Sequence, residues 1–141
     1  MRAFVEVEDA IVAAIAAAMP ELKVASLDDA PASADMLRLP AAFVTRAGMV
    51  ADDEDSPGCS ACEQYWKVYL CAKSASSGKA RRGERGIYAM EAAVIGALQD
   101  KTLGLGGISG FKVSRSESFM EDDSPEIAGQ VLTFVFKEMV D

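Results

Sequence analysis

The sequence contains no histidine in its 141 residues. Histidine is the commonest general base near neutral pH and the commonest metal ligand, and a neighbouring base activates serine and cysteine nucleophiles. Its absence removes every Ser-His or Cys-His nucleophilic arrangement and the commonest metal ligand. We therefore predict a protein that is not an enzyme and that needs no cofactor and no metal.

A long hydrophobic run is also absent. The longest apolar stretch, Ala10–Met19, is far too short to cross a bilayer. It follows Glu6, Glu8 and Asp9, whereas a signal peptide begins with basic residues. The sequence thus predicts no membrane partner, and synthesis in the cytoplasm of the cell that makes it.

Positive charge is scarce, since 14 lysines and arginines face 22 aspartates and glutamates, for a formal net charge of −8. A protein with nucleic acid as its principal partner needs a basic face to neutralise phosphates, so this class is disfavoured. Half of the residues are hydrophobic, and the length is typical of one domain. We expect a single folded domain over 1–141.

The hydrophobic periodicity indicates two helices and five strands. Val7, Ile11 and Ile15 recur at helical spacing, and Pro20 ends that helix. In the clearest strand, Trp66 and Val68 alternate with residues of the other face. The expected elements are helices over 5–19 and 84–100, strands over 22–27, 41–46, 65–73, 111–119 and 127–139, a possible helical turn over 35–39, exposed loops over 28–34, 52–62 and 103–110, and a flexible Ser/Gly-rich segment over 74–83.

This order fits an α+β two-layer sandwich. We expect an antiparallel or mixed sheet of about four to five strands, with two helices packed on one face. Trp66, Phe134 and Phe136 are the expected core anchors. If Phe134 is fully buried, its replacement by alanine should cost about 3–5 kcal/mol.

Cys59 and Cys62 form the one pattern that suggests a chemical site. A Cys-x-x-Cys pair can supply half of a zinc site or a thioredoxin-type redox pair. Only Cys71 remains to complete a zinc site, and the pair lies in an expected loop beside four carboxylates, whose charge disfavours a reactive thiolate. We interpret the two cysteines as ordinary loop thiols, with a metal or redox protein as the alternative.

The four glycines between Gly104 and Gly110 superficially suggest a phosphate-binding loop. The lysine and hydroxyl residue of a P-loop are missing, and a strand is expected to follow, so no helix N-terminus is offered to a phosphate. We interpret these glycines as a tight connection. The acidic residues at 6–9 and 121–123 lack the spacing of a calcium loop and are expected to be solvated.

Two oppositely charged segments are the candidate contact sites. The basic one has no aromatic residue, which disfavours binding of single-stranded nucleic acid. It remains open whether it is a solvated loop, a contact to a neighbouring subunit, or a positive surface near passing DNA. The candidate residues are Asp52, Asp53, Glu54 and Asp55 in the acidic segment, and Lys79, Arg81, Arg82 and Arg85 in the basic one.

Several stretches along nearly the whole chain resemble the tail terminator family of Mu-like phages and prophages. The segment 52–64 has no counterpart in that pattern. The resemblance is carried by Val7–Ile15 followed by Leu22–Val24, by Leu39–Val44 with its proline, by the strand Trp66–Ala72, by Gly86–Ala89 opening a helix that ends in Ala97-Leu98, by Leu103–Leu105, and by the aromatic strand Leu132–Phe136.

The resemblance implies a structural virion protein. Such proteins form a ring, usually a hexamer, on the last ring of the tail tube, stop its polymerisation and present the surface that docks to the head. The implied partners are further copies of the chain, the tail tube protein and a head–tail connector protein, with DNA only as cargo passing through the lumen. Another head–tail neck or completion protein is the alternative, because such proteins share size and fold class.

The charge asymmetry suits a head-to-tail ring, in which one surface meets a different surface of the neighbour. We expect the acidic residues 52–55 and the basic residues 79–85 to face each other across subunits or across the junction with the next ring. A competing placement directs the basic segment into the lumen of the ring.

Overall fold

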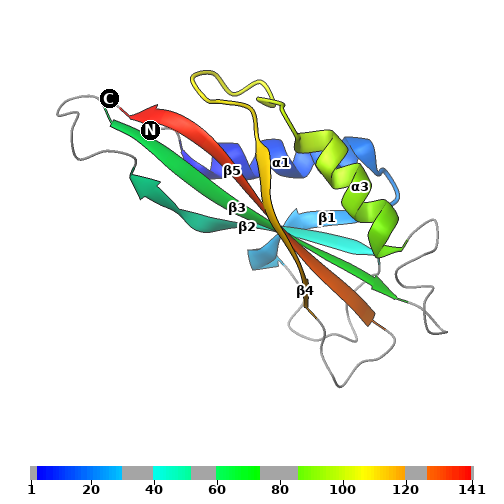
Figure 1. Cartoon of the computed structure of the whole chain (residues 1–141). Coiled ribbons are helices and arrows are strands. Elements are labelled where there is room, and N and C mark those ends of the chain that lie inside the picture. The colour runs from blue at the N-terminus through cyan, green and yellow to red at the C-terminus, as the bar shows by residue number, and fades with distance from the viewer. Residues whose placement is uncertain (1–2, 30–39, 52–59, 74–85, 120–126, 141) are drawn as a thin grey trace.

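The computed structural model describes residues 3–29, 40–51, 60–73, 86–119 and 127–140. Its helices are α1 (Phe4–Ala18) and α3 (Ile87–Leu98), with a short 3₁₀ helix, η1 (Leu27–Asp29). Its strands are β1 (Lys23–Ser26), β2 (Ala41–Ala51), β3 (Ser60–Lys73), β4 (Lys112–Phe119) and β5 (Ile127–Val140) (Figure 1). No helix within these ranges is long and apolar enough to span a bilayer.

The five strands form one mixed sheet in the order β1-β2-β3-β5-β4. β1 pairs with β2 in parallel, and the other three pairings are antiparallel. β3 and β5 form the centre and pair along their full length, from Ser60↔Val140 to Lys73↔Ile127. The last strand in the chain is therefore a central strand of the sheet.

Both helices lie on one side of the twisted sheet (Figure 1) and contact each other. The periodic residues of α1, among them Ile11 and Ile15, are fully buried. α1 ends at Ala18, where the Met19 N–H still donates to the Ile15 carbonyl before Pro20 prevents continuation. α3 buries four side chains at helical spacing, namely Ile87, Met90, Val94 and Leu98.

The core lies between these helices and the even-numbered side of β3 and β5. Trp66 and Phe134 face each other directly in the β3–β5 register and are almost completely buried, as is Phe136. Phe111 packs against Phe136 with ring centroids 4.9 Å apart. The expected two-layer α+β sandwich and its three aromatic anchors are confirmed.

Several expected boundaries were wrong. The loop over 52–62 was extended too far, because Ser60–Cys62 already belong to β3, where they pair with the end of β5. β2 continues to Ala51 instead of ending at 46, because it stays paired with β3 beyond a shift in the pairing register at Ala47. The loop after β1 begins as the helix η1. The helical turn expected at 35–39 and the segment 74–83 lie outside the described residues.

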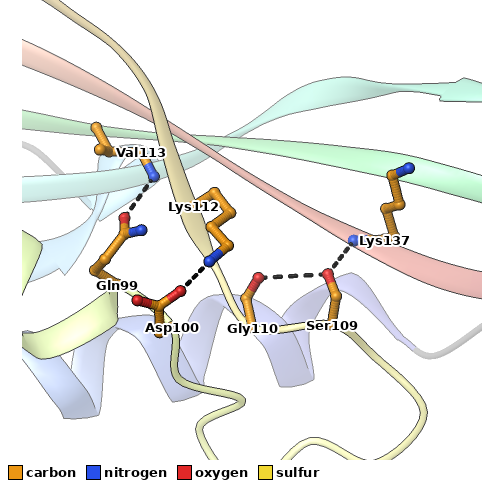
Figure 2. A network of polar contacts seen from close by, with 7 residues as sticks. All are labelled: Gln99, Asp100, Ser109, Gly110, Lys112, Val113 and Lys137. Atoms are coloured by element: carbon orange, nitrogen blue, oxygen red, sulfur yellow. Dashed lines mark hydrogen bonds and ion pairs between the residues drawn. The ribbon is translucent and has the colours of Figure 1, made fainter.

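The glycine-containing connection over 103–110 is confirmed as a set of turns and joins α3 to the sheet. The Ser109 N–H donates to the Lys137 carbonyl at 2.9 Å, and the Lys137 N–H donates to Ser109 Oγ at 2.9 Å (Figure 2). A Cβ added at Gly110 would lie 2.8 Å from the Asp100 carbonyl carbon. Only glycine allows the backbone at Gly110 to lie this close to the backbone of Asp100. This supports the interpretation of the glycines as a tight connection.

The two residues that follow α3, Gln99 and Asp100, are bonded to the residues at the start of β4. The Val113 N–H donates to the Gln99 side-chain oxygen at 2.9 Å, and Lys112 forms an ion pair with Asp100 (Figure 2). The Asp100 N–H also donates to the Phe111 carbonyl at 2.7 Å. These bonds fix where β4 begins, and β4 forms one wall of the surface described next.

Candidate interaction surface

The sheet face opposite the helices is the candidate functional surface. Side chains of a strand alternate between its two faces. Trp66 and Val68 point toward the helices, so the odd-numbered residues of β3 point away from them. The described helices α1 and α3 both contact the sheet from the other side and leave this second face uncovered. It carries partly buried apolar and aromatic residues beside charged ones, which is unlike a simple solvated face.

A groove with a volume of about 460 Å³ lies on this face. Its floor is formed by Tyr65 and Lys67 of β3 and by Val131 and Thr133 of β5. One wall is Ala47–Val50 of β2, and the other consists of the β4 residues Ser114, Arg115 and Glu117. The volume falls within the range of about 300–1,000 Å³ that is usual for binding sites in proteins.

Both walls contain a β-bulge at the groove. The register of β2 against β3 shifts between Arg46 and Gly48, and that of β4 against β5 shifts between Val113 and Arg115. The extra residues, Ala47 and Ser114, both line the groove. Because a bulge bends its strand and increases the local twist, the two bulges account for the hollow shape of this part of the sheet.

Gly48 makes the bulge in β2 possible. Its φ of 139° lies in a region that residues with a side chain rarely adopt. An added Cβ would meet no atom within 4 Å. The glycine is thus required by the backbone conformation, and crowding plays no part.

The charged residues of the groove form a row across the sheet. Lys67 is opposite Thr133, and Thr133 is opposite Arg115, which places the Cα atoms of the two basic residues about 10 Å apart at the usual strand spacing. Arg115 Nε lies 2.8 Å from Glu117 Oε1, with both side chains more than half exposed. Lys67 is partly buried as a whole residue, and its ammonium forms no ion pair or hydrogen bond within the described residues.

Tyr65 is oriented at the groove by its neighbour on the same face. Its hydroxyl donates a hydrogen bond to Glu63 Oε2 at 2.6 Å. This hydrogen bond is the main reason that the pKa of Tyr65 is raised above its ordinary value of 10.0, with smaller contributions from burial and from the negative charge of Glu63. Tyr65 therefore stays protonated and neutral at physiological pH.

At the core side of the same strands, three buried polar atoms lack a hydrogen-bond partner among the described residues, namely Arg46 Nε, Gln64 Oε1 and Trp66 Nε1. Arg46 and Trp66 are directly opposite each other, and Gln64 is two positions from Trp66. The Arg46 guanidinium lies over the Phe4 ring, 3.9 Å from its centroid. This contact joins the first turn of α1 to β2 behind the groove.

None of the charged candidates identified from the sequence can be placed. Both charged segments lie outside the described residues: the acidic one with Asp52, Asp53, Glu54 and Asp55, and the basic one with Lys79, Arg81, Arg82 and Arg85. The groove was not anticipated, because its lining comes from four strands that are far apart in the sequence. One available signal was Gly48 inside an apolar strand pattern, which is typical of a bulge.

The cysteine pair also differs from expectation. Cys62 is not a loop thiol, since it lies in β3 with 2% of its surface exposed, while Cys59 lies outside the described residues. Cys62 and Cys71 point to opposite faces and are separated by roughly 30 Å along one extended strand, so they cannot share a metal ion. No cluster of three or more metal-ligating side chains occurs in the described ranges.

Comparison with known proteins gives a likeness of fold. No family model matches this chain, and no curated protein matches it either. A chain of a solved structure described as "Virion of native gene transfer agent (GTA) particle" superposes with a TM-score of 0.57 at 16% sequence identity. The match covers 89% of this chain and 84% of that one.

Proposed function

We propose that this chain is a structural protein of a phage-like virion. The observation that carries the proposal is the shared fold with a chain of a gene transfer agent virion over 89% of the present chain. The sequence resemblance to tail terminators leads independently to the same class of particle. A chain of 141 residues without histidine is also easier to reconcile with an assembly role than with catalysis.

More specifically, we propose that the chain is a tail terminator. Copies of it form a ring, most simply a hexamer, on the last ring of the tail tube, where they stop polymerisation and offer the docking surface for a head–tail connector. The helix-free sheet face with its groove supplies a surface for such contacts, and the exposed apolar residues Phe4, Val5, Met49 and Val50 supply further contact area.

The ring is tested first with the purified chain. Light scattering coupled to size-exclusion chromatography should give a mass several times that of the 14.9 kDa chain, and electron microscopy should show rings. Adding the chain to polymerising tube protein from the same gene cluster should shorten the tubes and leave a cap at one end. A chain that stays monomeric alone and with tube protein, and leaves tube length unchanged, would contradict the proposal.

A second candidate is another protein of the head–tail junction. The matched structure is described as a whole virion, so its shared fold is equally compatible with a different component of such a particle. This candidate predicts binding to the connector, with no effect on tube length. The tube-polymerisation experiment therefore separates the two.

A further inference from the structure

We propose that the groove on the helix-free face receives the exposed turn Leu27–Asp29 of a neighbouring copy of this chain. The inference deepens the proposed ring by naming the surfaces that join its subunits, and it rests on that proposed function only in requiring that copies associate. Both surfaces consist of described residues.

The groove needs an occupant that carries a carboxylate. Lys67 lies on its floor without an ion pair among the described residues, and Val131 lines the same floor. Any partner that covers this floor removes water from the ammonium group. Burial of a charge is costly unless an opposite charge accompanies it, so an acidic partner is favoured over an apolar or basic one.

The turn η1 has the complementary chemistry. Leu27 is an exposed large hydrophobic residue, with 37% of its surface accessible, and it is followed by the exposed Asp28 and Asp29. Neither carboxylate forms an ion pair within the described part of the chain; the recorded hydrogen bond of Asp28 is made by its backbone N–H to Ser26 Oγ. An apolar side chain beside two carboxylates matches a groove with one apolar wall, Ala47–Val50, and a lysine without an ion pair on its floor.

The positions of the two surfaces allow one copy to use both. The turn follows β1, which is an edge strand, whereas the groove lies over the central strands β3 and β5. A contact between two different surfaces of identical chains repeats from copy to copy, and it closes into a ring when the rotation permits. The contact therefore suits a head-to-tail ring.

A charge-swap experiment tests the contact. Lys67→Glu alone, and Asp28→Lys with Asp29→Lys, should each weaken self-association by about tenfold in Kd, because each leaves like charges facing each other. The variant that combines all three changes should restore association close to that of the unchanged protein. Sedimentation velocity over a concentration series at low salt measures each Kd, and the differences should shrink as salt is added.

Matched controls carry the same charge changes elsewhere. Lys101→Glu follows α3 and Asp9→Lys lies on α1, and both side chains are exposed and outside the groove and the turn. These variants should associate like the unchanged protein. Thermal melting of all variants shows whether any loss of association reflects unfolding.

Each outcome decides the matter. Restoration by the combined swap supports the contact. If Lys67→Glu forms unchanged rings, or if the combined variant fails to restore the association that the separate changes abolish, this contact is wrong and the proposed function is unaffected. Loss of tube binding in Lys67→Glu with self-association intact also overturns it, because the groove then serves the tube protein. A chain that never associates, with or without tube protein, overturns the contact and the proposed ring together.

Discussion

The ring of Phe119 lies against the backbone of Gly129, its direct partner in the β4–β5 pairing. A Cβ added at Gly129 would sit 2.6 Å from the Phe119 carbonyl oxygen and 2.7 Å from two atoms of its ring. The same ring meets Tyr69 of β3 edge-on, with centroids 5.5 Å apart. Glycine at this position thus lets an edge-strand aromatic residue reach across β5 to the centre of the sheet.

We predict that Gly129→Ala destabilises the protein by about 1–3 kcal/mol, as overpacking commonly does. The Phe119 ring can swing aside, but the backbone carbonyl oxygen of Phe119 is held in β4. An added methyl group therefore forces β4 and β5 apart. Gly96→Ala is the control, because that glycine lies within α3 with no atom within 4 Å of an added Cβ, and the change should stabilise by roughly 0.5–1 kcal/mol. Urea unfolding measures both, and an unchanged midpoint for Gly129→Ala would refute the close contact.

Phe134→Ala should cost about 3–5 kcal/mol of unfolding free energy, because the side chain is completely buried opposite Trp66. The next residue, Val135, is only partly buried and points to the other face, so Val135→Ala should cost distinctly less. Chemical denaturation monitored by the fluorescence of the one tryptophan gives both values. Equal losses for the two variants would mean that the faces of β5 are assigned wrongly.

Gln64→Met is expected to leave stability unchanged or to increase it by up to about 1 kcal/mol. Gln64 is buried, its Oε1 has no partner among the described residues, and its amide nitrogen makes only a 3.5 Å contact with Cys62 Sγ. Replacing a buried, poorly satisfied polar group by an apolar one of similar shape removes a desolvation cost.

Gln130→Met is the matched control for that change. The Gln130 amide donates to Ser116 Oγ at 2.7 Å and accepts from Ser118 Oγ at 3.2 Å. Loss of these two hydrogen bonds should destabilise the protein by roughly 0.5–1.5 kcal/mol for each bond. Thermal melting that ranks the two variants in the opposite order would show that Gln64 has a hydrogen-bond partner.

The Tyr65 hydroxyl should titrate above pH 10, because its hydrogen bond to Glu63 favours the protonated form. The folded state holds this proton more tightly than the unfolded state, so the contribution to stability is present below pH 10 and is lost as pH rises through the raised pKa. Ultraviolet titration of the protein and of Tyr65→Phe isolates this tyrosine. Glu63→Gln should move its pKa back toward the ordinary value, and no movement would refute the assigned cause.

Much of the fold was predictable because its periodic signals are strong. The spacing of Val7, Ile11 and Ile15 and the alternation around Trp66 follow from burial of one face, and the helices and central strands were placed correctly on that basis. Strand ends were less predictable. Glu63 and Gln64 are poor strand formers by residue type, yet they belong to β3 because β5 pairs with them on one side and β2 on the other.

The groove could not be predicted in the same way. Its shape depends on two bulges and on a register that brings Lys67, Thr133 and Arg115 into one row. Those relationships join residues separated by up to about half of the chain, and the period of the hydrophobic residues carries no information about them. The charged candidates were local features of composition, which is why the sequence favoured them over a surface assembled from four strands.

The central position of β5 also has a consequence for the order of events during synthesis. β5 is synthesised after the other four described strands, and β4 has no other neighbour in the sheet that the described residues form. Until Ile127–Val140 are made, β3 lacks one side of its pairing and the aromatic core around Phe134 does not exist. Since such long-range pairings form slowly, the sheet should be completed only after Ile127–Val140 have been synthesised, and a chain that lacks this strand should not assemble.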